Sequence, residues 1–291
     1  MLMSSKLEIT TYKVEKKMKR IISLLLVLAV ALSFVACNRG EGGAAGYGAG
    51  GGQSLREGST SPLHSPIAQD ETYQKLLGLN IILYPPPVDD PKFEPYGAAY
   101  WDLDATEFVE AMRGAFDGEM GDRPVYEPQV EALQDLPLVQ QISETIYNGE
   151  PVQVGWIYGN NAVLEYLELN DVTVTLISAE NIVIFVGDES NLDPSMWQFD
   201  VKKAKAFYIP ANAVVALNPR VLHSAPLRVS REAGALTAVI VPQGVGLGAA
   251  SAGEGIDQAL VAEGRWIFAF EGVDGFYAGL TGSPITINPV D

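Results

Sequence analysis

The sequence has a single cysteine, Cys37, and only two histidines in 291 residues. One cysteine cannot form a disulfide within the chain, so a packed core must stabilise the folded part. The chain also lacks a nucleophile elbow, a Cys–His pair and a phosphate-binding loop. These absences exclude the common signatures of acyl transfer and of nucleotide binding.

Basic residues are scarce as well, with 19 Lys and Arg against 36 Asp and Glu. Residues 1–36 hold six of the basic and two of the acidic side chains, so the remainder has 13 basic and 34 acidic residues and a formal charge of −21. Such a surface repels the phosphates of nucleic acids and anionic lipid headgroups. We therefore expect no nucleic-acid partner.

Four basic residues (Lys16, Lys17, Lys19 and Arg20) precede an almost uncharged run over residues 21–36. This run is shorter than the roughly 20 residues that span a bilayer, which is typical of a signal peptide. It ends in Phe34-Val35-Ala36-Cys37, which resembles the bacterial lipobox, although Phe34 replaces the usual leucine. Residues 1–36 are thus predicted to be a signal peptide, with Met18 as the true start. An uncleaved anchor and cleavage at another site remain alternatives.

The resemblance implies that Cys37 carries the lipid, and that the protein is exported and held on the outer side of the cell membrane. Residues 37–61 are rich in glycine and have few apolar side chains. Such a segment buries too little surface to offset ordering, which predicts a flexible tether. Residues 62–291 are long enough for one core and are predicted to form one β domain with an N-terminal helical extension.

Within this domain, residues 62–92 are predicted to be extended, proline-punctuated chain. One helix is predicted from an N-cap at Asp104, with Phe108 and Met112 on its apolar face, and a second over 128–147, interrupted by Pro137. Short apolar runs predict strands near 152–158, 162–168, 172–178, 182–187, 205–209, 213–217, 226–230, 235–241 and 265–270. This spacing favours a mainly β sandwich or barrel. The small-residue segment 244–255 is predicted to be a flap over one barrel mouth.

Residues 93–270 resemble an uncharacterised bacterial cupin-like family, a domain of unknown function. The matching segments are Phe93-Glu94-Pro95-Tyr96-Gly97, Val152-Gln153-Val154-Gly155, Gly159-Asn160-Asn161, Leu164-Glu165-Tyr166, Ala206-Phe207-Tyr208-Ile209-Pro210-Ala211, Leu222-His223-Ser224-Ala225-Pro226 and Val241-Pro242-Gln243-Gly244. The resemblance implies a cupin-like jelly-roll barrel. In that family a Glu-Tyr-His stretch, a following glutamate and a later histidine would line the interior as metal or ligand contacts.

The sequence departs from this pattern at three positions. Leu167 and Phe270 stand where the family would have histidines, and Asp171 replaces the following glutamate. The remaining candidates for a divalent metal are Glu165, Asp171 and His223, and the apolar replacements are expected to line the pocket. The same three residues, with Tyr166 and Asn161, are the candidate ligand contacts.

His223 and Glu165 are the candidates for acid–base catalysis, although His223 could equally be a histidine at the edge of the core, bonded to a carbonyl or carboxylate. The leading hypothesis is a lipoprotein domain that binds a small polar, sugar-like ligand beside a degenerate metal site, with no cofactor firmly implied. The first alternative is an envelope lyase or isomerase that acts on a carbohydrate derivative with the help of a metal. The second is a protein-interaction module without a small-molecule site. The oligomeric state is left open.

Overall fold

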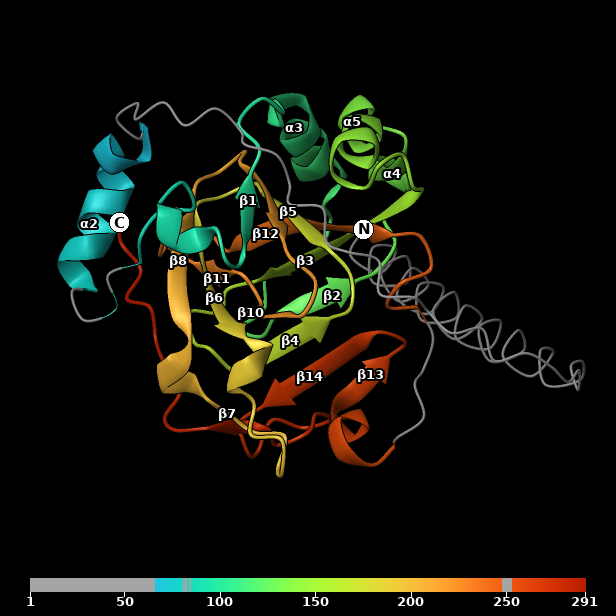
Figure 1. Cartoon of the computed structure of the whole chain (residues 1–291). Coiled ribbons are helices and arrows are strands. Elements are labelled where there is room, and N and C mark those ends of the chain that lie inside the picture. The colour runs from blue at the N-terminus through green and yellow to red at the C-terminus, as the bar shows by residue number, and fades with distance from the viewer. Residues whose placement is uncertain (1–65, 81–82, 84, 248–252) are drawn as a thin grey trace, which may run out of the picture. The chain divides into compact units, whose positions relative to one another are not determined.

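The computed structural model describes residues 66–80, 83, 85–247 and 253–291 (Figure 1). The predicted signal peptide over 1–36, the lipidated Cys37 and the tether lie outside these residues, as does the centre of the predicted flap. Within the described part, no helix is both long and apolar enough to cross a membrane.

Two antiparallel sheets form the body of the domain. The first sheet has the order β1-β9-β5-β12-β3-β2, and the second has the order β11-β6-β10-β4-β14-β13, with β8 paired to β6. The strands of the first sheet are β1 (Gly97–Ala99), β2 (Val125–Glu127), β3 (Val152–Gly159), β5 (Val174–Ser178), β9 (Val214–Leu217) and β12 (Ala235–Pro242). Those of the second are β4 (Tyr166–Asn170), β6 (Ile182–Asp188), β8 (Lys205–Ile209), β10 (Val221–Ser224), β11 (Leu227–Arg228), β13 (Leu260–Ala262) and β14 (Arg265–Ala269). A separate parallel pair joins β7 (Phe199–Asp200) to β15 (Leu280–Thr281).

Eight of these strands make two interlocked Greek keys. The chain enters at β3 and crosses between the sheets, so that one sheet contains β9-β5-β12-β3 and the other β8-β6-β10-β4. The early strand β3 pairs with the late strand β12 in the first sheet, and β4 pairs with β10 in the second. This pairing of early with late strands is the pattern of a jelly roll. The predicted mainly β class is confirmed.

Helices cover the outer face of the first sheet. They are α3 (Thr106–Ala115), α4 (Glu131–Gln134) and α5 (Pro137–Ile146), and Figure 1 shows them together beside β5 and β12. Phe108 and Met112 of α3 are buried in the core beneath them, as the predicted apolar face requires. The second predicted helix is divided into α4 and α5 because Pro137 lacks the N–H that a continuous helix needs.

The prediction that residues 62–92 are extended is wrong, because α2 spans Glu71–Leu79. Asp70 caps this helix by accepting a hydrogen bond from Tyr73 N at 3.0 Å. Tyr73 and Leu76 are buried against the outer face of the second sheet, where the rings of Tyr73 and Tyr208 lie 4.9 Å apart. The described part thus contains four α-helices rather than two, together with the 3₁₀ segments Pro66–Gln69, Pro91–Phe93, Glu189–Asn191, Val201–Lys203 and Gly255–Ala259.

Three apolar cores alternate with the two sheets. One core lies between the helices and the first sheet, a second lies between the sheets, and a third lies under α2 and the C-terminal segment. Strand β6 is therefore buried on both faces. Ile182 and Ile184 face the core between the sheets, while Val183 and Phe185 face the core under α2. Strands covered on both faces are continuously apolar, so their sequence does not reveal which side chains face the interior.

Candidate functional site

Strand β10 places His223 in the middle of the second sheet. The strand predicted near 226–230 is present as the short β11, but His223, which was placed before it, lies in a strand of its own, β10 (Val221–Ser224), between β4 and β6. His223 is directly opposite Glu168 of β4 in the antiparallel register, so both side chains leave the sheet on the same face. Val221, two residues earlier, packs in the core between the sheets, and therefore this face is the inner one.

A group of polar side chains gathers around His223 inside the jelly roll. We call it the interior cluster: Tyr126, Tyr166, Glu168, Asn170, His223 and Arg265. Arg265 Nη2 donates to Glu168 Oε2 at 2.7 Å, and the two side chains are 15% and 14% exposed. The guanidinium carbon of Arg265 also lies 4.6 Å from the ring centroid of Tyr126. This tyrosine comes from β2 of the opposite sheet, so the cluster links the two sheets.

Asn170 sets the protonation of His223. Asn170 Nδ2 donates to Glu168 Oε1 at 2.8 Å and lies 3.1 Å from His223 Nε2. Because an amide nitrogen only donates, Nε2 must accept, and the ring proton lies on Nδ1, 3.4 Å from the carbonyl oxygen of Ser224. Burial lowers the pKa of His223, against the opposing influence of the Glu168 charge. The imidazole is therefore neutral near pH 7.

Glu168, in contrast, is ionised. Burial alone would raise its pKa, but the charge of Arg265 and the hydrogen bond from its guanidinium outweigh burial, so that the pKa is held at about 2. The same surroundings act on the tyrosines in the opposite direction. Burial, followed by the Glu168 charge, raises the pKa of Tyr126 to about 12 and also raises that of Tyr166. Both phenols therefore stay protonated as hydrogen-bond donors.

A small cavity of about 20 Å³ lies against the cluster. Tyr126, Tyr166, Glu168, His223 and Arg265 line it on the polar side, and the apolar side is formed by Ile157, Leu176 and Val239. A cavity of this size holds about one water molecule. Pockets for drug-sized ligands begin at roughly 300 Å³, so a larger molecule would have to displace a lining group.

The structure brings only part of the predicted site together. Tyr166 and His223 belong to the interior cluster. Asp171 lies on the surface, where its Oδ1 is 2.6 Å from Arg220 Nη1. Glu165 borders a separate small pocket with Asn161, which is buried and whose Oδ1 has no partner among the described residues. The predicted set of Glu165, Asp171 and His223 therefore does not converge.

The expectation for the two lost histidine positions is also corrected. Leu167 is fully buried in the core outside the second sheet, and the partly buried Phe270 packs against the same core. Neither lines the barrel, because Leu167 is one residue away from the inward-facing Tyr166 and Glu168. In the described part of the chain, no three His, Cys, Asp or Glu side chains are grouped to hold a metal ion. Inside the barrel, Glu168 already pairs with Arg265, so these residues do not fit a metal.

Sequence reasoning overlooked four members of the cluster: Tyr126, Glu168, Asn170 and Arg265. For two of them a signal was present, because Tyr166, Glu168 and Asn170 follow each other at the period of two that defines one face of a strand. Arg265 and Tyr126 come from β14 and β2, and nothing local in their sequence indicates that they meet.

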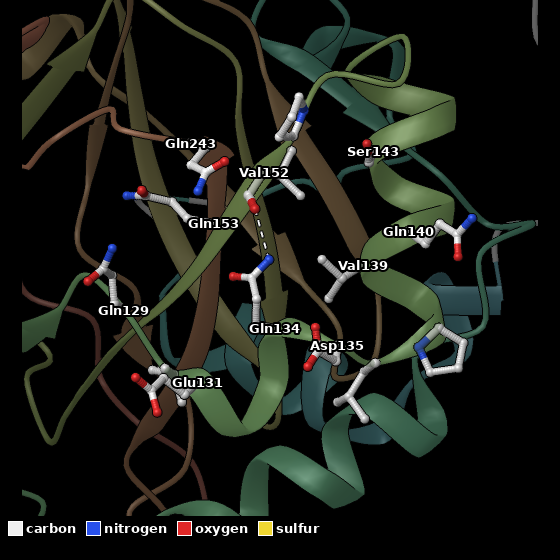
Figure 2. A pocket seen from close by; sticks show the side chains of 14 residues that line it. Gln129, Glu131, Gln134, Asp135, Val139, Gln140, Ser143, Val152, Gln153 and Gln243 are labelled. Atoms are coloured by element: carbon white, nitrogen blue, oxygen red, sulfur yellow. Dashed lines mark hydrogen bonds between the residues drawn. The ribbon is translucent and has the colours of Figure 1, made fainter.

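A wider groove of about 770 Å³ lies outside the barrel, between α4, α5 and β3. Figure 2 shows its glutamine-rich lining, with Gln134 donating to the carbonyl oxygen of Val152 at 2.8 Å. Gln134 also accepts from Val154 N, and Gln153 bonds Gly244 N and Val245 O. These amides already serve to join the helices and loops to the edge of β3. The interior cluster, which has unused donors, is therefore the stronger candidate site.

Comparison with known proteins identifies the family. A family model described as a domain of unknown function, DUF4867, matches residues 86–285. The chain belongs to this family. The match covers the two sheets and all six members of the interior cluster, and it confirms the predicted membership in a domain of unknown function.

No curated protein matches the DUF4867 chain. Among solved structures, an arginine-to-alanine variant of Bacillus subtilis oxalate decarboxylase has a TM-score of 0.27 at 8% identity, covering 43% of this chain and 26% of that one. A second structure, from a study of the Mn(II) centres of the same enzyme, has a TM-score of 0.27 at 7% identity, covering 45% and 28%. The chain thus spans about a quarter of the length of those structures.

Proposed function

We propose that the DUF4867 domain is a cupin-like jelly roll that binds a small polar, sugar-like molecule at the interior cluster. The observation that carries this proposal is the unused hydrogen-bonding capacity at the cavity. Arg265 Nε is buried and has no partner among the described residues. Buried polar groups in native proteins are nearly always paired, so an unpaired donor beside a cavity points to a missing acceptor.

The energetics of buried ion pairs supports the same conclusion. Replacing a buried ion pair by apolar residues of similar volume is often neutral or stabilising, so stability alone is a weak reason to keep Glu168 and Arg265 inside a core. A pocket with a few convergent polar groups on an otherwise apolar wall is the usual form of a ligand site. Here the wall is Ile157, Leu176 and Val239, and the polar groups converge from the four strands β2, β4, β10 and β14.

Ligand entry requires the cavity to widen. Strand β2, which carries Tyr126, has only three residues and lies at the end of the first sheet, paired with β3 alone. An edge strand this short is held by few hydrogen bonds and can move at low cost. Displacement of Tyr126 from the Arg265 guanidinium would connect the cavity to solvent.

A thermal-shift screen of the purified protein against neutral sugars, polyols and sugar acids tests the proposal. A ligand that raises the melting temperature, and whose effect is lost in Tyr166→Phe but kept in Tyr277→Phe, supports it. Tyr277 is the matched control because its hydroxyl bonds the carbonyl oxygen of Met196, away from the cluster. If saturating concentrations of every compound leave the melting temperature unchanged, the interaction-module alternative is favoured.

The proposed setting is the outer side of the cell membrane, with lipid on Cys37. It is supported by the basic and apolar segments before this residue and by the acidic charge of the remainder, which disfavours adhesion to anionic lipid by charge. Membrane residence would then depend on acyl chains, each contributing about 0.8 kcal/mol per buried CH₂. Mass spectrometry of the mature N-terminus tests this: a diacylglycerol-modified Cys37 is expected, and an unmodified Cys37 in a full-length chain would refute it.

A further inference from the structure

The hydrogen-bond inventory of the interior cluster identifies what kind of atom its ligand must supply. Each acceptor already has one partner: Glu168 Oε1 accepts from Asn170, Glu168 Oε2 accepts from Arg265, and His223 Nε2 faces the Asn170 amide. The unoccupied groups are donors. Arg265 Nε–H has no partner, and neither the Tyr126 nor the Tyr166 hydroxyl makes a hydrogen bond with the described residues.

The charge of the cluster restricts the ligand further. Glu168 and Arg265 balance each other, and Arg265 is the only Lys or Arg among the residues that line the cavity. An added carboxylate would leave one negative charge unpaired inside the barrel, which is costly. An uncharged acceptor avoids this cost.

Among uncharged acceptors, a carbonyl fits better than an alcohol. A carbonyl oxygen has two lone pairs and no proton of its own, so it can accept from two of the three donors at once. An alcohol also brings a proton that needs an acceptor, whereas the Glu168 oxygens and His223 Nε2 at the cavity each already have one partner. The cavity volume of about 20 Å³ also suits an oxygen-sized group entering end-on rather than a whole sugar ring.

We infer that the interior cluster is a carbonyl-recognition site, which takes the ketone or aldehyde oxygen of an uncharged, sugar-like compound between Tyr126, Tyr166 and Arg265. This inference rests on the proposed function and narrows its ligand class. The carbonyl end lies in the cavity, and the rest of the ligand extends toward β2, where Tyr126 moves to admit it. Donors aimed at one carbonyl oxygen also stabilise negative charge that develops there, as in an oxyanion hole.

Three compounds with the same three-carbon skeleton provide a matched test: dihydroxyacetone, glycerol and glycerate. The carbonyl carbon of 2-¹³C-labelled dihydroxyacetone is followed by NMR as purified protein is added, and the affinities of glycerol and glycerate are measured by competition. We expect a saturable downfield shift of the carbonyl signal and at least about tenfold weaker binding of the other two compounds. Tyr126→Phe and Tyr166→Phe should each weaken dihydroxyacetone binding by about fivefold, the effect of one hydrogen bond, while Tyr277→Phe has no effect.

The contradicting outcomes are distinct. If glycerate binds most tightly, the inference that the ligand is uncharged is wrong. If glycerol binds as tightly as dihydroxyacetone, the inferred preference for a carbonyl is wrong. Either result is still consistent with a ligand site at the interior cluster. Dihydroxyacetone binding that both tyrosine variants leave unchanged also refutes the inference, because the compound would then bind elsewhere. If none of the three binds, the inference fails. The proposed function fails with it only if the wider sugar and polyol screen is negative too.

Discussion

Replacing Glu168 by glutamine tests whether the buried ion pair organises the interior of the jelly roll. The substitution keeps the side-chain volume and an oxygen that can accept from Asn170, but it removes the charge that faces Arg265. The guanidinium is then left 15% exposed beside the ring of Tyr126 without a carboxylate. At an effective dielectric constant of about 20, two charges about 4 Å apart attract by about 4 kcal/mol. Removing one partner of a buried pair typically costs about 3–5 kcal/mol.

We therefore expect Glu168→Gln to lower the free energy of unfolding by about 3 kcal/mol, measured by urea denaturation at pH 7. Glu168→Met combined with Arg265→Met removes both charges and should recover most of the loss, because no unpaired charge remains. A double-mutant cycle with the single variants gives the coupling energy between the two side chains. A loss below about 1 kcal/mol in Glu168→Gln, or a double variant less stable than both single variants, would refute this account of the cluster.

Three further predictions concern the same region. Since the folded pKa of Glu168, about 2, lies below its ordinary value of 4.5, its stabilising contribution is complete above pH 4.5 and is lost as the pH falls toward 2. Urea titrations at pH 5 and pH 2.5 should show a loss of up to about 3 kcal/mol from this group, which Glu168→Gln does not show; parallel losses in both proteins would contradict the assignment. Asn170→Ala should raise the pKa of His223, because it removes the donor that favours the neutral ring, and proton NMR resolves this easily in a chain whose only other histidine is His64; an unchanged titration would show that Asn170 does not set the tautomer. Leu167→His should create no metal site and should destabilise the fold by about 2–4 kcal/mol, since it buries an unpaired polar ring in the outer core; metal bound in equilibrium dialysis would show that this position faces the interior after all.

Much of the fold was predictable because it depends on local patterns. Runs of Val, Ile, Phe and Tyr between turn residues gave most of the strands, and Pro137 indicated where the helical segment divides. Helix α2 was not predicted from the sequence. It is stabilised by the packing of Tyr73 and Leu76 on Tyr208, a residue more than 130 positions away in sequence. Strand β10 was not predicted because it is only four residues long and half of it is the polar pair His223 and Ser224. Strands are recognised in a sequence by longer runs of β-branched and aromatic residues.

The site was harder to predict because sheet strands alternate faces. Assigning Glu165 and Leu167 to the interior instead of Tyr166 and Glu168 is a one-residue shift, and such a shift turns every side chain of a strand to the opposite face. The resemblance to a Glu-Tyr-His stretch predicted that Glu165 and the Leu167 position line the interior. The pairing of β4 with β10 shows instead that Tyr166 and Glu168 face inward. Arg265 meets Glu168 through β14, nearly a hundred residues later, and that contact follows from the topology rather than from any local motif.

The central claim is that the interior cluster receives a ligand, and electron density tests it most directly. Crystals of the protein soaked with dihydroxyacetone should show a ligand oxygen within hydrogen-bond distance of Tyr166 Oη and Arg265 Nε, with Tyr126 displaced from the guanidinium. Density for a single water in the cavity, with Tyr126 unmoved and the compound found only in the outer groove beside Gln134 or nowhere, would contradict the claim.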